Sequence, residues 1–116
     1  ICRLCTPNLA LTLECINATT GWDWTVDDVR ETGVRIVNLM RMFNFRHGLT
    51  KEMEAPSVRY SSTPTDGPVA GIGIREHWDA IRDHYYGQMG WDVETGKPLP
   101  ETLEKYGLTE LVEQYS

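Results

Sequence analysis

Two cysteines near the start of the 116-residue chain, Cys2 and Cys5, have the spacing that most suggests chemistry. Thiolates three positions apart can bind one metal ion or one iron–sulfur cluster. Cys15 is the only other cysteine, so a complete four-thiolate site would need ligands from elsewhere. The spacing alone is weak evidence for such a site, and without further context we favour the alternative that the thiols are buried and inert. A thioredoxin-type redox pair is disfavoured because no strand–helix–strand pattern surrounds the motif.

The histidines and the acidic pairs do not form a second candidate site. His77 and His84 lie two helical turns apart, roughly 10 Å along a helix axis, which is too far for one ion. His47 lies alone in a predicted loop, and we expect all three imidazoles to be solvated or locally bonded. The acidic residues at 27–28 and 52–54 are interpreted as helix-cap charges and a solvated loop face, not as catalytic carboxylates.

Helical periodicity accounts for most of the remaining chain and predicts an all-α, multihelical fold. Three longer helices are expected at about residues 8–18, from Thr25 to the region of Phe43, and at about 74–89. Two short helices are expected to open near Pro100 and Thr109. No alternating strand pattern occurs in the sequence.

The second predicted helix has a clear start and a clear apolar face. Thr25 offers a capping hydroxyl, and Asp28 follows three residues later near the positive end of the helix dipole. The apolar residues on one face are Val29, Ile36, Val37, Met40 and Phe43. We interpret this face as core packing.

Periodicity is lost between Asn44 and about Gly73, where glycine, proline and serine are frequent. We predict a long irregular loop between the second and third main helices, with Gly71-x-Gly73 as a turn because a dinucleotide-binding loop would need a third glycine and a preceding strand. A loop of this length is uncommon in a compact domain. We interpret it as functional or, preferably, as a segment that covers another part of a larger protein.

Length and charge set limits on the protein's class. We expect residues 1–116 to form a single helical domain. Eleven basic against 17 acidic residues give a net charge of −6, which argues against nucleic-acid binding, and no apolar run is long enough to span a membrane. The odd number of cysteines favours a reducing compartment, by default the cytoplasm. A first residue other than methionine suggests a fragment or a processed product.

The turns of this chain have more distinctive residue patterns than its helices. They are Thr20-Gly21-Trp22-Asp23, Phe43-Asn44-x-Arg46-x-Gly48, Gly67-Pro68, Tyr85-Tyr86-x-x-x-Gly90-Trp91-Asp92, Gly96-x-Pro98 and Gly107-Leu108. Their order and spacing closely resemble the C-terminal region of the tungsten-dependent aldehyde ferredoxin oxidoreductases. The resemblance runs from Ile1 to about Leu108.

The resemblance implies a function and a set of cofactors. Members of that family carry a tungsten (or molybdenum) bis-pterin and a 4Fe-4S cluster, oxidise aldehydes to carboxylic acids and pass the electrons to ferredoxin. This chain would be most of the third, helical domain. By resemblance Cys2 is the fourth cluster ligand and the metal-binding residue, and Ile1 and Arg3 are cofactor contacts. No catalytic residue is assigned to this segment, and the separate chain is expected to bind no cofactor and to be inactive.

The chain departs from the family pattern at several positions. The family usually has an aromatic residue at position 5, so Cys5 is expected to pack and not to bind the cluster. Arg46-His47-Gly48 and the residues around Met53-Glu54 also differ, which allows a different substrate. The alternatives are a family member that reduces an aromatic thioester ring, and a non-catalytic helical interaction module.

The expected partners follow from the same resemblance. They are the remaining domains of the enzyme, ferredoxin and an aldehyde substrate. Trp22, Trp24, Trp91 and the apolar face of the helix at 74–89 are expected to pack against a neighbouring domain. The chain by itself would then expose apolar surface and is a possible homo-oligomer.

Overall fold

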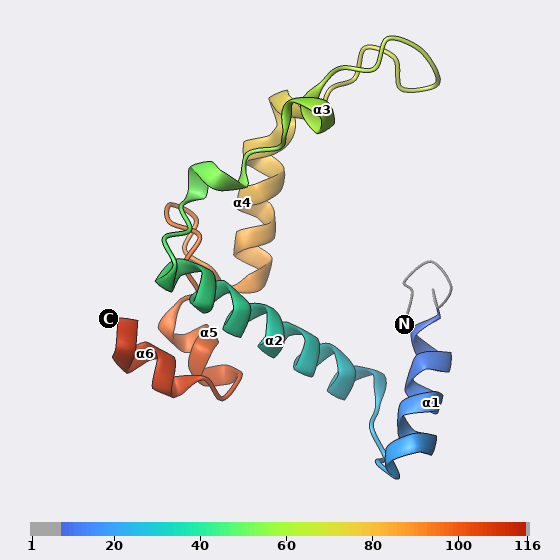
Figure 1. Cartoon of the computed structure of the whole chain (residues 1–116), viewed down its shortest axis with the longest axis vertical. Helices are drawn as coiled ribbons and strands as arrows, with labels where there is room; N and C mark the ends of the chain where they lie inside the picture. The colour runs from blue at the N-terminus through green and yellow to red at the C-terminus, as the bar shows by residue number, and fades with distance from the viewer. Residues whose placement is uncertain (1–7, 116) are drawn as a thin grey trace. The chain divides into compact units, whose positions relative to one another are not determined.

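The computed structural model describes residues 8–115, and side chains up to Val112. Within that range the protein is helical and contains no strand, apart from an isolated bridge between Trp91 and Pro98. This confirms the all-α prediction. The elements are α1 (Leu9–Thr20), α2 (Val26–Arg46), η1 (Lys51–Glu54), α3 (Val58–Ser61), η2 (Arg75–His77), α4 (Trp78–Met89), α5 (Pro100–Lys105) and α6 (Thr109–Tyr115), as Figure 1 shows.

The chain divides into two compact units, one up to Val37 and one from Asn38 onward. The expectation of a single domain over residues 1–116 stays a prediction. No described helix is long and apolar enough to cross a membrane.

Helix α1, in the first unit, is capped at both ends by adjacent residues of the chain. The Asn8 side chain accepts hydrogen bonds from the amides of Ala10 and Leu11, at 2.9 and 3.4 Å. Gly21 follows the helix in the left-handed conformation (φ 75°), and its amide donates to Asn17 O. The helix therefore ends at Thr20, two residues later than the periodicity predicts.

The start of α2 is the capping box that the sequence predicts. The Thr25 amide donates to Asp28 Oδ2 at 2.7 Å, and the Asp28 amide donates to Thr25 Oγ1 at 3.3 Å. The hydrogen bonds to Thr25 lower the pKa of Asp28. The interpretation of this acidic residue as a helix-cap charge is confirmed.

The prediction that the apolar face of α2 is core was wrong for the described chain. Met40 and Phe43 are each 59 % exposed, and Ile36 is 50 % exposed. The residues of α2 that are buried are Asn38, Arg41 and Met42. The helix therefore buries a different face, on which two of the three side chains are polar.

The long connection between α2 and α4 is less irregular than the sequence predicts. It contains η1 and the single turn α3, and its tip is a turn in which the Gly71 amide donates to Pro64 O at 2.9 Å. Gly71 thus ends a turn as predicted, whereas Gly73 lies beyond it. Beyond it, the first turn of the predicted third helix is the 3-10 helix η2, and α4 starts at Trp78.

A small apolar core lies in the second unit where α5 and α6 pack together (Figure 1). Met42, Leu103 and Leu108 are buried there, and Leu111 and Val112 pack against them. Pro100 occupies the first turn of α5, where its missing amide hydrogen costs nothing. Both short C-terminal helices thus form where the sequence predicts them.

Candidate functional site

The residues assigned to cofactor binding from the sequence, Ile1, Cys2 and Arg3, lie outside the described residues, as does Cys5. Their roles stay predictions. Among residues 8–115, no group of three or more His, Cys, Asp or Glu side chains could hold a metal ion. No reaction step is assigned to this part of the chain.

The other candidate side chains lie on the surface. His77 and His84 are exposed, and His47 is exposed with its ring edge-on to that of Phe43, the two ring centroids 4.2 Å apart. The expectation that the three imidazoles are solvated or locally bonded is confirmed. Cys15 is an exposed free thiol, so the expectation of burial was wrong for this cysteine.

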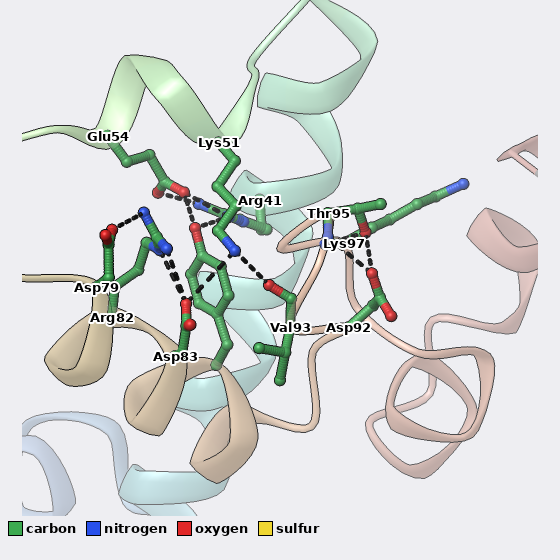
Figure 2. Close-up of polar contacts among 11 residues, drawn as sticks. Arg41, Lys51, Glu54, Asp79, Arg82, Asp83, Asp92, Val93, Thr95 and Lys97 are labelled. Atoms are coloured by element: carbon green, nitrogen blue, oxygen red, sulfur yellow. Dashed lines mark hydrogen bonds and ion pairs between the residues drawn. The ribbon is translucent and has the colours of Figure 1, made fainter.

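The structure instead buries a charged side chain in the second unit. The Arg41 side chain, 7 % exposed, forms a two-pronged ion pair with the Glu54 carboxylate, in which Nη2 lies 2.8 Å from Oε2. Arg41 also donates to Gly96 O (2.9 Å) and to Tyr86 Oη (3.1 Å), and the Tyr86 hydroxyl donates to Glu54. We call Arg41, Glu54, Tyr86 and Gly96 the Arg41 network. Arg41 lies on α2 and Glu54 on η1, both labelled in Figure 2, whereas Tyr86 lies on α4 and Gly96 in the connection between α4 and α5.

Aromatic rings enclose the guanidinium. Its Cζ atom lies 4.3 Å from the ring centroid of Trp91, 5.0 Å from that of Phe45 and 5.1 Å from that of Tyr86. Ring faces attract a cation most strongly where water is excluded. The rings therefore help to offset the loss of hydration that burial imposes on Arg41.

The electrostatics of the network favour fixed charges. Burial acts against the charge of Arg41, but hydrogen bonds to Glu54 and Tyr86 outweigh it and raise the pKa of the guanidinium. The hydrogen bond from Arg41 lowers the pKa of Glu54, although burial opposes the shift. Burial and the neighbouring carboxylate raise the pKa of Tyr86. At neutral pH the network thus holds a cation, an anion and a neutral phenol, none of which is poised for proton transfer.

A second set of charges ties η1 to α4 and to the following turn. Lys51 Nζ donates to Val93 O at 2.7 Å and lies 3.5 Å from Asp83 Oδ1. Arg82 pairs with Asp79 and with Asp83, each at 2.9 Å (Figure 2). These side chains are partly exposed, so each pair contributes little alone. The Arg82 pairs lie within α4, whereas Lys51 and Glu54 hold the two ends of η1 against α4.

The Gly90-Trp91-Asp92 motif is a structural corner. Gly90 ends α4 in the left-handed conformation (φ 68°), and Trp91 then turns inward to donate from Nε1 to Asn38 Oδ1 at 2.8 Å. Asp92 Oδ1 accepts hydrogen bonds from the amide and the hydroxyl of Thr95, at 2.7 and 2.6 Å. Trp91 is only 5 % exposed, so the expectation that it faces a neighbouring domain was wrong. Trp22, by contrast, is 51 % exposed.

Gly96 is required by the close approach of Arg41. A Cβ atom at this position would lie 2.3 Å from Arg41 Nη2 and 2.9 Å from the Tyr86 ring, and the backbone has φ 73°. Only glycine combines this conformation with the absence of a side chain. The Gly96-x-Pro98 motif therefore serves the Arg41 network directly.

Sequence reasoning missed this network and placed Glu54 on a solvated loop face, which was wrong. The available signal was an arginine between two methionines in the apolar stretch of α2, from Leu39 to Phe43. A charge at such a position needs a partner. The partner lies 13 residues away and the accepting carbonyl 55 residues away, so spacing could not identify either.

Comparison with known proteins agrees with the motif order. Residues 1–108 match the family described as "Aldehyde ferredoxin oxidoreductase, domains 2 & 3". The chain is 33 % identical over 99 residues to the tungsten-containing aldehyde ferredoxin oxidoreductase of Pyrococcus furiosus, covering 84 % of this chain and 16 % of that protein. It is 34 % identical over 101 residues to the Pyrococcus horikoshii enzyme of the same name, covering 85 % and 16 %. No solved structure gives a significant match.

The matched region includes all the turns described above. Among its motif residues, Gly21 and Gly90 end helices, and Gly96 leaves space for the Arg41 side chain. The chain spans about 16 % of the length of the curated relatives it matches. On the extent of the match, this chain belongs to the aldehyde ferredoxin oxidoreductase family.

Proposed function

We propose that this chain is the C-terminal helical portion of an oxidoreductase that oxidises aldehydes to carboxylic acids. In the complete protein the electrons would pass through a 4Fe-4S cluster to ferredoxin. The observation that carries this proposal is the family match over residues 1–108, together with relatives whose names specify tungsten, aldehyde and ferredoxin. The bis-pterin tungsten or molybdenum centre, when bound, supplies the two-electron oxidation.

Within this proposal, residues 1–3 make the direct contribution of the chain to the cofactors. Cys2 supplies one thiolate to the cluster, and three further ligands come from sequence outside the 116 residues. Ile1 and Arg3 contact the pterin, partly through their backbone. Hydrogen bonds and burial around the Cys2 sulfur would then tune the cluster potential. A thiolate-bound cluster suits a reducing compartment, and we place the enzyme in the cytoplasm.

The described residues serve this function as a scaffold. The Arg41 network fixes η1 and the turn at Gly96 to α2 and α4, with its charges paired and its aromatic rings shielding them. Buried, fully satisfied polar networks of this kind hold a single arrangement of the surrounding backbone. The second unit thus provides a rigid support, and the chemistry takes place at groups that other segments hold.

The test is substitution of the cysteines in the complete gene product. Cys2→Ala should lose cluster iron and ferredoxin-linked aldehyde oxidation, because one of four ligands is removed. Cys5→Ala and Cys15→Ala are the matched controls and should keep both properties, since neither thiol is assigned to the cluster. Unchanged iron content in the Cys2→Ala protein would refute the assignment.

A further inference from the structure

The connection between α3 and η2 contains an aspartate that is followed by glycine. Asp66 and Gly67 form this pair, whereas the other six aspartates precede residues with a side chain, and none of the four asparagines precedes glycine. A glycine amide is the least hindered nucleophile of a polypeptide backbone, because no Cβ atom shields it. Attack of the backbone on a side-chain carboxyl is therefore least hindered at Asp66.

The structure leaves both reacting groups accessible. Asp66 and Gly67 are exposed, in a segment that contains no helix (Figure 1). Gly67 has φ 79° and no atom within 4 Å of a Cβ position. Among the described residues, the Gly67 amide donates no hydrogen bond, and the Asp66 carboxylate forms neither a hydrogen bond nor an ion pair. Nothing in the described part of the chain holds the carboxyl group away from the amide.

The other aspartates are restrained or shielded. Asp92 Oδ1 accepts hydrogen bonds from the amide and the hydroxyl of Thr95, at 2.7 and 2.6 Å, and the next residue, Val93, is branched at Cβ. Asp23 precedes the large side chain of Trp24. The remaining four lie in the fixed backbone of α2 or α4 and are Asp27, Asp28, Asp79 and Asp83. Among the described aspartates, Asp66 alone combines a free carboxylate with an unshielded neighbouring amide.

We propose that Asp66-Gly67 is a site of spontaneous conversion to isoaspartate through a cyclic succinimide. The Gly67 nitrogen attacks Asp66 Cγ and forms a C–N bond, while the hydroxyl of the protonated carboxyl group leaves with the amide hydrogen as water. A second water molecule opens the five-membered ring. Opening at Cγ restores aspartate, whereas opening at the main-chain carbonyl leaves Gly67 attached to Cγ, which is isoaspartate. The net reaction changes neither mass nor oxidation state, and water is its only co-reactant.

The conversion alters the turn that contains the pair. In isoaspartate the main chain runs through Cβ and Cγ, so it is longer by one methylene group. The turn is closed by the hydrogen bond from the Gly71 amide to Pro64 O, at 2.9 Å, which spans the reacting bond. The added backbone atom changes the spacing between this donor and this acceptor. The modified protein thus has the same charge and a different loop tip.

Ageing of the complete gene product at neutral pH tests the proposal. The protein is digested, and isoaspartate is detected by methyl transfer from S-adenosylmethionine with a protein isoaspartate methyltransferase and by chromatographic separation of peptides of equal mass. We expect isoaspartate to accumulate over weeks in the peptide that contains Asp66, at a rate within a few-fold of that in a synthetic peptide of residues 60–72. The peptide that contains Asp92 is the internal control and should stay unconverted.

Asp66→Glu is the matched variant. It keeps the negative charge, but its longer side chain would have to close a six-membered ring, which forms far more slowly. Its peptide should accept no methyl group. Conversion in the folded protein that is slower than in the free peptide by more than a few-fold would overturn the proposal. Equal methylation of the wild type and the variant, or equal conversion at Asp92, would also overturn it. The inference is independent of the proposed function, because no cofactor enters the reaction.

Discussion

Arg41 and Glu54 form a two-pronged ion pair between α2 and η1, with Arg41 almost completely buried and Glu54 about one-quarter exposed. A buried guanidinium of this kind is stable only while its partners remain. Arg41 therefore fixes the positions of η1, α4 and the turn at Gly96, and the Glu54 carboxylate of η1 neutralises its charge.

Glu54→Gln should destabilise the second unit. The amide keeps the size of the side chain but removes the negative charge, so Arg41 loses its counter-ion. We expect the free energy of unfolding to fall by about 2 kcal/mol, less than for a fully buried pair because Glu54 is partly solvated. Urea denaturation followed by circular dichroism measures the change. Glu52→Gln is the matched control from the same 3-10 helix. It should change stability far less than Glu54→Gln because Glu52 is exposed.

The same pair predicts how stability depends on pH. The pKa of Glu54 is lowered in the folded protein, mainly by the hydrogen bond from Arg41. A glutamate in an unfolded chain has a pKa of about 4.3. Its contribution is present above that value and is lost as the pH falls through the folded pKa. Between about pH 5 and pH 3, the wild-type chain should therefore lose stability more steeply than Glu54→Gln.

Other carboxylates do not obscure this comparison. The pKa values of Asp28, Asp83 and Asp92 are also lowered, chiefly by hydrogen bonds, but these residues are present in both proteins and their effects cancel. Urea denaturation at several pH values gives the two curves. Parallel curves would show that Glu54 does not titrate as the structure implies.

Gly96→Ala should lower the free energy of unfolding much more than the same substitution at a glycine with no neighbouring atoms. The new methyl group would overlap Arg41 Nη2 and the Tyr86 ring, and the left-handed backbone would be strained. We expect a loss of about 2 to 4 kcal/mol from the two effects together. Gly107→Ala is the control, because Gly107 has φ 66° and no atom within 4 Å of a Cβ position. That variant should lose only about 1 kcal/mol from backbone strain. Equal losses would mean that the contact with Arg41 is unimportant.

Asn38→Leu should uncover the role of the buried amide. Asn38 is fully buried and accepts the Trp91 Nε1 hydrogen bond, so leucine leaves a buried indole N–H without an acceptor. We expect a loss of about 1 to 3 kcal/mol in the free energy of unfolding. A double-mutant cycle with Trp91→Phe isolates the pair, since the two losses should be less than additive. Full additivity would rule out a direct energetic link between the two side chains.

The sequence by itself determined the longer helices, several of their ends and the family. Asn8, Thr25 and Pro100 mark helix starts through local capping chemistry, and Gly21 and Gly90 mark ends through left-handed backbone, so neighbouring residues suffice to predict them. Some of the turn motifs that carry the family resemblance act at the same short range, but Trp91 and Gly96 also contact residues more than 50 positions away.

Only the tertiary structure decided which face of α2 is buried and what the buried charge contacts. Periodicity shows which side chains share a face of a helix, but not what covers that face. Met40 and Phe43 are exposed, whereas Arg41 is buried because Glu54, Tyr86 and Gly96 come together around it from distant parts of the chain. That meeting depends on how the chain folds back on itself, and no local pattern of residue types records it.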